Sequence, residues 1–187
     1  WASSFCRQLG IRFPQATIRQ TVMSVGPGAA ELPATLHTAG VSLTRRGDGG
    51  YLLAISGRAR VDPTPQFLRF APQFMPMFLR RWRSLSPGGL EGLRSGHERL
   101  ARWRLDAPTP MERMRILDPK VDATTVRLTH RRALELVPAL KARAVTAAWA
   151  GYIDSTPDGV PGIGESASLP GMLLAAGFSG HGFGIGP

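Results

Sequence analysis

The last residues of the chain place an apolar run directly before a series of glycines. Residues 171–177 read GMLLAAG, and glycine then occupies every second position from 180 to 186. A buried strand that leads into a glycine-rich turn and a helix start can present backbone N–H groups to an anion or a polarised ring. The alternative is a flexible glycine tail, but Phe178, Phe183 and Ile185 are apolar residues that favour burial. The pattern therefore favours a buried strand, a turn and a helix start.

The middle of the chain alternates apolar and polar residues in the manner of strands. The alternation occurs in residues 15–25, 39–46 and 50–56, and the sequence RGDGGY at 46–51 supplies a glycine-rich turn between the last two. These stretches predict an antiparallel sheet.

Further strands and a turn are predicted toward the carboxyl end. Residues 144–153 (AVTAAWAGYI) have the pattern of a strand, and residues 160–164 form a short extended piece. STPDG at 155–159 predicts a type I turn, because Pro157 and Gly159 occupy positions that this turn favours.

Two shorter patterns predict helices with clear start or stop signals. Residues 3–11 begin with a serine that can cap a short helix and reach Gly10, a good helix stop. Residues 122–140 begin with Asp122 as the predicted cap. The buried stripe of this second helix is predicted to include Val126, Ala133, Leu134 and Val137. Helices mixed with an antiparallel sheet define an α+β chain.

A third helical pattern lies in residues 63–82. Its apolar positions have helical spacing, but Pro72 and Pro76 are expected to break or kink the helix. The aromatic and methionine stripe at 74–78 is expected to belong to the core rather than to a cofactor site.

The positive charge of the chain raises the question of nucleic acid binding. The 187 residues carry a net charge of +10. RRWR at 80–83 and ERLARWR at 98–104 set tryptophans between arginines, which can stack on bases. Arginine stems beside an aromatic ring more often form an ordinary amphipathic surface, and the other arginines are spread along the chain. We therefore expect no nucleic acid partner, and keep an arginine-rich RNA-binding module as an alternative.

Other classes of protein are disfavoured by residue usage. Cys6 is the only cysteine, so no internal disulfide can form and a cytoplasmic location is expected. The four histidines are far apart in the sequence, which disfavours a metal site. Glycines and prolines interrupt the apolar end of the chain, so no integral membrane segment is expected. The start at Trp1, without a signal-peptide pattern, and the end inside a predicted helix indicate a piece of a longer protein.

Two stretches together resemble a known family. WAGYIDSTPDGVPGIG at 149–164 and LPGMLLAAGFSGHGFGIGP at 169–187 look like the carboxy-terminal signature of FAD-dependent amine and amino-acid oxidoreductases related to D-amino-acid oxidase, glycine oxidase and sarcosine oxidase. The opening WASSFCRQLGIRFP at 1–14 is similar to the stretch that follows the last Rossmann strand in those enzymes. The joint pattern of TPDG, a strand and GHGF is the specific part of this resemblance.

The resemblance implies a two-domain flavoenzyme of which this chain holds part. Residues 1–15 would end the FAD-binding domain, residues 16–148 would form a substrate domain with an antiparallel or mixed sheet, and residues 149–187 would return to the Rossmann-like FAD-binding domain. The fingerprint G-x-G-x-x-G would precede Trp1, in the missing amino-terminal half of the same protein. The chain alone is therefore expected to bind FAD poorly and to be inactive.

The resemblance also implies the cofactor contacts, in a turn and helix start whose amides favour the negative charge of the reduced flavin. The predicted contacts are Gly180, His181, Gly182, Phe183, Gly184 and Ile185, with Trp1 as a further one. Glycine is expected there because a side chain would hold the backbone away from the ring. His181 is also the candidate catalytic residue, although the resemblance favours a positioning role for it. Gly151 stands where sarcosine-oxidase-like enzymes carry a flavin-linking cysteine, so FAD is expected to bind non-covalently.

Substrate contacts are predicted at Tyr51, Ile153 and Asp154. Glycine-oxidase-like enzymes clamp the substrate carboxylate with an arginine where this chain has Ile153, so an arginine from the middle region, such as Arg58 or Arg60, would have to replace it. Asp154 is interpreted mainly as a cap of the DSTPDG turn. Alternatively, its carboxylate attracts a cationic amine substrate.

The predicted reaction is the oxidation of the carbon–nitrogen bond of an amine or an amino acid, D-amino acids included. A hydride would pass from the alpha carbon to the flavin, and the resulting imine would hydrolyse, so that no dedicated side-chain base is required. The electron acceptor after the flavin is left open. The alternatives are a non-catalytic subunit of a multi-component amine oxidase and the RNA-binding module.

Overall fold

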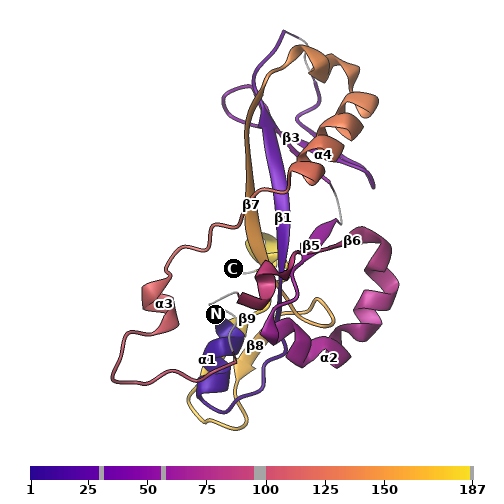
Figure 1. Cartoon of the computed structure of the whole chain (residues 1–187). Helices are drawn as coiled ribbons and strands as arrows, with labels where there is room; N and C mark the ends of the chain where they lie inside the picture. The colour runs from indigo at the N-terminus through magenta and orange to yellow at the C-terminus, as the bar shows by residue number, and fades with distance from the viewer. Residues whose placement is uncertain (30–31, 56–57, 95–99, 186–187) are drawn as a thin grey trace. The chain divides into compact units, whose positions relative to one another are not determined.

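The structure is a computed structural model that describes residues 1–29, 32–55, 58–94 and 100–185 (Figure 1). Ser56, Glu98, Arg99 and Gly186, which entered the sequence predictions, lie outside the described residues. The helices and strands are α1 (Ala2–Gln8), β1 (Ala16–Val25), β2 (Thr35–His37), β3 (Ser42–Arg45), β4 (Tyr51–Ala54), β5 (Ala59–Val61), α2 (Pro65–Arg81), β6 (Leu85–Pro87), α3 (Pro110–Arg113), α4 (Ala123–Leu136), β7 (Val145–Ser155), β8 (Gly162–Glu165), β9 (Leu173–Ala176) and α5 (Gly182–Ile185). Short 3₁₀ turns lie at η1 (Trp82–Ser84), η2 (Leu90–Arg94) and η4 (Pro138–Ala142). The chain is α+β, as the sequence predicts.

The chain divides into two compact units, and each is assembled from separate segments. The first unit holds residues 1–19, 60–117 and 152–187. The second unit holds residues 20–59 and 118–151. The predicted boundaries at residues 15 and 148 separate the FAD-binding and substrate domains of a whole flavoenzyme. The two units of this chain do not test them, so these boundaries stay a prediction.

In the first unit, α1 begins one residue earlier than its predicted serine cap. Trp1 is the cap residue, and Ser3 lies inside the helix, where its hydroxyl donates to the carbonyl of Phe13 at 2.7 Å. The serine is therefore used for a tertiary contact, and its prediction as a cap was wrong. Gly10 follows the helix with φ +79°, which confirms it as part of the stop.

Helix α2 continues through both of its prolines for 17 residues. Pro72 and Pro76 do not break the helix, although each proline removes one N–H donor, and the predicted kink is not tested. The helix is held instead by a buried face, since Phe70 and Phe74 lie one turn apart and pack with Ala16. The rest of the predicted stripe is not core in this chain, because Met75 and Phe78 are exposed.

A two-stranded antiparallel hairpin of β8 and β9 completes the first unit. Gly162 pairs with Ala176 and Glu165 with Leu173. Ala176 packs with Cys6 and Phe13, whereas Leu173 is 79% exposed. The sequence predicts the strand correctly but not its burial, because only one face of the hairpin is covered in this chain.

The second unit contains the predicted antiparallel sheet. Strands β2, β3, β4 and the end of β1 lie in that order, and β7 also pairs with β1. The register joins Met23 to Leu53 and Leu43 to Leu53. The predicted turn between β3 and β4 is confirmed, since the Arg46 amide donates to the carbonyl of Gly50 at 2.8 Å.

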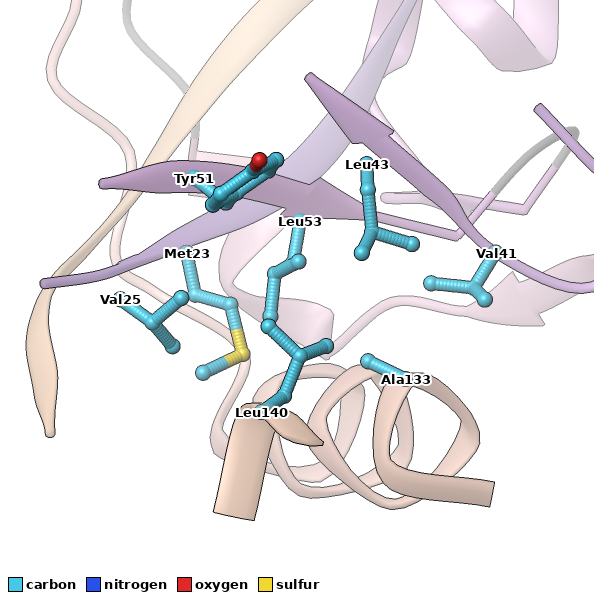
Figure 2. Close-up of a cluster of buried hydrophobic side chains, with 8 residues drawn as sticks. All are labelled: Met23, Val25, Val41, Leu43, Tyr51, Leu53, Ala133 and Leu140. Atoms are coloured by element: carbon cyan, nitrogen blue, oxygen red, sulfur yellow. The ribbon is translucent and has the colours of Figure 1, made fainter. Parts of the chain in front are cut away.

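Helix α4 covers one face of this sheet and closes the core of the second unit. Figure 2 shows Ala133 of α4 and Leu140 of η4 facing the side chains of the strands. The buried cluster consists of Met23, Val25, Val41, Leu43, Tyr51, Leu53, Ala133 and Leu140. The predicted cap is confirmed, because the Asp122 carboxylate accepts from the Thr124 amide at 3.1 Å.

Arg143 is a buried residue that joins its own segment, before β7, to two loops of the second unit. Its guanidinium donates to the carbonyl oxygens of Gly26 at 3.1 Å, Gly28 at 3.2 Å and Gly49 at 3.2 Å. The same group lies over the ring of Tyr51, 5.1 Å from the ring centre. The rigid fork of donors in arginine suits this arrangement, and an ammonium group cannot reproduce it.

We expect Arg143→Lys to lower the free energy of unfolding by about 1 to 3 kcal/mol, because the buried Gly26 carbonyl and the part-buried bonds to Gly28 and Gly49 lose their donor. The measurement is chemical denaturation of the full-length protein, with hydrogen exchange in residues 20–59. Arg131→Lys is the matched control, since Arg131 is an exposed residue of α4 that lies near Glu135, and it should change stability by less than about 0.5 kcal/mol. Equal effects of the two substitutions would contradict this role of Arg143.

Candidate functional site

The predicted flavin turn is a loop between β9 and α5 with unusual backbone angles. Gly177 has φ +79°, Ser179 has φ 54° and Gly180 has φ +86°. L-residues rarely adopt such angles, so glycine suits two of these positions and the surroundings must stabilise the third. The loop is thus a defined turn, and the structure agrees with the sequence analysis in placing a turn and a short helix after the strand.

Asp154, at the end of β7, holds this loop. Its carboxylate Oδ2 accepts from the buried Gly177 amide at 2.7 Å, and its backbone carbonyl accepts from the Ser179 amide at 2.9 Å. The interpretation of Asp154 as the cap of the DSTPDG turn was wrong, since Asp158 fills that role by accepting from the Val160 amide at 3.0 Å. This hydrogen bond lowers the pKa of Asp158.

The TPDG turn is also joined to the loop. The Gly159 amide donates to the Thr156 carbonyl at 3.2 Å and Gly159 has φ +79°, which confirms the predicted turn. The Thr156 amide donates to the Ser179 hydroxyl at 3.3 Å, and the Thr156 hydroxyl donates to the Val160 carbonyl at 2.8 Å. Thr156 and Ser179 were not among the predicted site residues, and their only sequence signal was their place in the TPDG and GFSGHGF motifs.

The glycines of the loop differ in how much space a side chain would find at each of them. A Cβ on Gly180 would lie 3.5 Å from the side chain of Ile153, and one on Gly182 would lie 3.3 Å from that of Phe178. A Cβ on Gly184 would meet no heavy atom within 4 Å. A Cβ on Gly182 would therefore be tight against Phe178, whereas one on Gly180 would make an ordinary contact, and glycine suits position 180 because of its φ of +86°. The space beside Gly184 holds no described heavy atom within 4 Å of a Cβ.

The side chains of the predicted turn lie on the surface of this chain. Phe183 is fully exposed, and His181 and Ile185 are exposed. The expectation that Phe183 and Ile185 are buried was wrong for this chain. The backbone of His181 shapes the turn, because its amide donates to Phe178 at 2.9 Å and its carbonyl accepts from Gly184 at 3.0 Å.

The remaining predicted contacts fall in different places. Ile153 and Asp154 lie beside the loop, and Trp1 is half-buried at the start of α1 in the same unit. Tyr51 belongs to the core of the second unit, is 2% exposed, and donates its hydroxyl to the Leu32 carbonyl at 2.9 Å (Figure 2). Its predicted contact with substrate stays untested.

The arginines considered for the substrate carboxylate also fall in separate units. Arg58 lies in the second unit and Arg60 in the first. The Nε of Arg60 lies 3.7 Å from Oδ1 of Asp62, and the same oxygen accepts from Arg19 at 3.4 Å. Arg60 is thus engaged with a carboxylate of the chain itself.

Two further properties of the chain bear on the site. Across the described ranges, no helix is both long and apolar enough to span a membrane. The same part of the chain brings together no group of three or more histidine, cysteine, aspartate or glutamate side chains suited to a metal ion.

Comparison with known proteins defines the class. The family model for the FAD dependent oxidoreductases (DAO) matches residues 1–187, and the chain belongs to this family. The family is FAD-dependent, which agrees with the cofactor that the sequence predicts. A search of curated protein sequences found no match.

Solved structures share the fold at low sequence identity. L-amino acid deaminase from Proteus vulgaris is 18% identical with a TM-score of 0.85, and the match covers 97% of this chain and 42% of the deaminase. L-amino acid deaminase from Proteus myxofaciens, in complex with anthranilate, is 19% identical with a TM-score of 0.86, over 97% of this chain and 40% of the deaminase. Glycine oxidase from Geobacillus kaustophilus is 18% identical with a TM-score of 0.62, over 97% of this chain and 35% of the oxidase. The chain thus spans about two fifths of the length of the deaminases.

We expect Asp154→Ala to destabilise the loop by about 1 to 3 kcal/mol, because it leaves the buried Gly177 amide without its acceptor. Faster hydrogen exchange of residues 177–180 in the full-length protein would report the change. Asp158→Ala removes the same kind of bond from an exposed turn and should have a smaller effect on that exchange. Unchanged exchange in Asp154→Ala would show that the carboxylate does not hold the loop.

Proposed function

We propose that the full-length protein is a flavoenzyme that oxidises the carbon–nitrogen bond of an amino acid to an imine, with FAD bound non-covalently. The observation that carries this proposal is the family match over the whole chain. The names of the two deaminases direct attention to L-amino acids, in addition to the amines and D-amino acids that the sequence suggests. The Rossmann-like nature of residues 1–15 and 149–187 is part of the same proposal.

The residues of the loop fit a flavin. No side chain stands beside Gly184, where a Cβ would meet no described heavy atom within 4 Å. The amides of Gly184 and Ile185 already donate to the His181 carbonyl at 3.0 and 3.2 Å, so a flavin would lie against the bare backbone there. Bound FAD would accept a hydride from the substrate carbon that carries nitrogen. The family resemblance, the bare backbone and the absence of cysteine at Gly151 together support a non-covalent contact with Gly180 to Ile185.

The chain's own residues have positioning roles in this proposal. Asp154 and Thr156 hold the loop, and Ile153 presents an apolar side chain next to Gly180. An apolar residue at 153 cannot clamp a carboxylate, so another cation must do so. His181 lies on the surface of the turn, where a part in catalysis or in flavin positioning stays a proposal.

Gly184→Val provides a direct test of the flavin contact. A Cβ at Gly184 would meet no described heavy atom within 4 Å, so the stability of the protein without FAD should stay within about 0.5 kcal/mol of the parent. The affinity for FAD should fall about tenfold or more, because the backbone can no longer approach the ring. Flavin titration of the deflavinated full-length protein measures this.

Gly171→Val is the control, because Gly171 also has open space around it but lies in the turn before β9. Gly171 has a φ of +82°, so Gly171→Val destabilises the protein by itself. The FAD affinities of the two variants are therefore compared under conditions in which the same fraction of each protein is folded. Equal FAD affinity of the Gly184→Val variant and the parent protein would contradict the proposed contact.

The reaction itself is tested with the full-length protein and a panel of L-amino acids, D-amino acids and simple amines. We expect stoichiometric FAD, dye reduction with at least one amino acid, and release of ammonia and a keto acid. FAD without turnover on any substrate would favour the non-catalytic subunit. Absence of flavin together with salt-dependent RNA binding would favour the RNA-binding module.

A further inference from the structure

Ser179 lies in the turn between β9 and α5, in a backbone conformation that glycine favours. It has φ 54°, and in the described part of the chain it is the one residue other than glycine with a positive φ. Gly180 follows with φ +86°, and the His181 amide donates to the Phe178 carbonyl at 2.9 Å. Positive φ at both central residues is the mark of a type I′ turn, which favours asparagine, aspartate or glycine there. A serine at the first central position therefore needs support from its surroundings.

The hydroxyl of Ser179 provides this support through two hydrogen bonds. It donates to the Gly177 carbonyl at 3.1 Å and accepts from the Thr156 amide at 3.3 Å. A rotation of φ to a negative value would carry the hydroxyl away from both partners, because φ sets the direction of the side chain relative to the preceding peptide group. The left-handed backbone costs an L-residue about as much as two such bonds contribute, so the hydroxyl decides whether the turn is stable.

Both partners of this hydroxyl are themselves fixed. The Gly177 amide donates to the Asp154 carboxylate at 2.7 Å, and a Cβ on Gly177 would collide with the methyl group of Thr156. The Thr156 hydroxyl donates to the Val160 carbonyl at 2.8 Å. Since that bond uses the hydrogen of Thr156, the Ser179 hydroxyl, 3.4 Å from the Thr156 hydroxyl, keeps its own hydrogen for Gly177. The hydroxyl of Ser179 thus meets partners that are already in place.

The type of this turn sets the direction in which the chain enters α5. A turn with negative φ at its central residues has the opposite backbone angles, so its peptide groups on either side of Ser179 are rotated. The residues that follow, 180–185, are the proposed flavin contact. A change of turn type would therefore move the backbone that the flavin is proposed to meet.

We propose that Ser179 is a positioning residue for the flavin. Its hydroxyl holds the turn in the left-handed form, and the turn fixes the backbone of residues 180–185 where the ring binds. This assignment rests on the proposed function, because it requires FAD at the loop. Ser179 acts through the backbone and does not touch the reacting atoms.

The test compares Ser179→Ala with Ser179→Gly in the full-length protein. Alanine loses the hydroxyl and keeps the cost of the left-handed backbone, whereas glycine loses the hydroxyl and has no such cost. Ser168→Ala is the control, because Ser168 is an exposed serine of the same unit whose hydroxyl lies 3.1 Å from that of Ser166. Denaturation by urea verifies that each protein is folded under the conditions of the measurements. If Ser179→Ala does not fold, Ser179→Cys replaces it, since a thiol is only a weak hydrogen-bonding group.

The first measurement is made without FAD and follows hydrogen exchange of the His181 amide, which closes the turn. We expect this exchange to be about tenfold faster in Ser179→Ala, because the bonds that offset the left-handed cost are lost. In Ser179→Gly it should stay within about threefold of the parent, since glycine adopts the turn without that cost. Ser168→Ala should exchange as the parent does.

The second measurement is the titration of the deflavinated protein with FAD. The apparent affinity of a ligand falls with the fraction of molecules that have the binding conformation. We therefore expect the FAD affinity to fall about fivefold or more in Ser179→Ala, and to stay within about threefold of the parent in Ser179→Gly. Ser168→Ala should bind FAD as the parent does. The rescue by glycine distinguishes positioning of the backbone from a direct contact between the hydroxyl and the flavin.

Three results would overturn the proposal and leave the proposed function intact. They are FAD affinities equal to the parent's in both Ser179 variants, equal losses of affinity in the two variants, and a loss of affinity at unchanged exchange of the His181 amide. A parent protein that binds no FAD would overturn this proposal together with the proposed function. The behaviour of the parent thus tells the two failures apart.

Discussion

The hydrogen bond between the Asp154 carboxylate and the Gly177 amide joins two parts of the candidate site. It connects the end of β7 to the end of β9, and the Ser179 amide adds a second connection to the same residue. Ser179 has a left-handed backbone angle that costs about 1 to 2 kcal/mol in an L-residue, so the turn needs such support. The conformation of the loop that is proposed to contact the flavin thus depends on Asp154, which lies 23 positions before Gly177 in the chain.

Features set by near neighbours in the chain were predictable from sequence. The Asp122 cap involves an amide two residues on, and the TPDG turn closes between Thr156 and Gly159. The strands of the sheet are likewise visible in the alternation of apolar residues. In each case the residues that decide the structure lie within one turn or one strand of each other.

Features set by distant partners were not predictable. The target of Asp154 lies 23 residues away, and the carbonyls that Arg143 bonds lie 94 to 117 residues away. The exposure of Leu173 and Phe183 depends on what covers the hairpin and the turn, which apolar character alone does not reveal. For the candidate site, the sequence predicted the turn and the short helix after β9, whose contact with flavin stays a prediction. The roles of Thr156 and Ser179 were not predicted, and that of Asp154 was misplaced.

The division of the first unit into three segments has a consequence for folding during synthesis. Residues 1–19 and 60–117 leave the ribosome before residues 152–187, which supply the β8–β9 hairpin that packs on Cys6 and Phe13. Contacts that join distant segments form slowly, because a long loop must first be closed. The apolar side chains of α1 therefore stay without these partners until residues 152–187 have been synthesised. An apolar surface left uncovered during that interval can bind chaperones or aggregate.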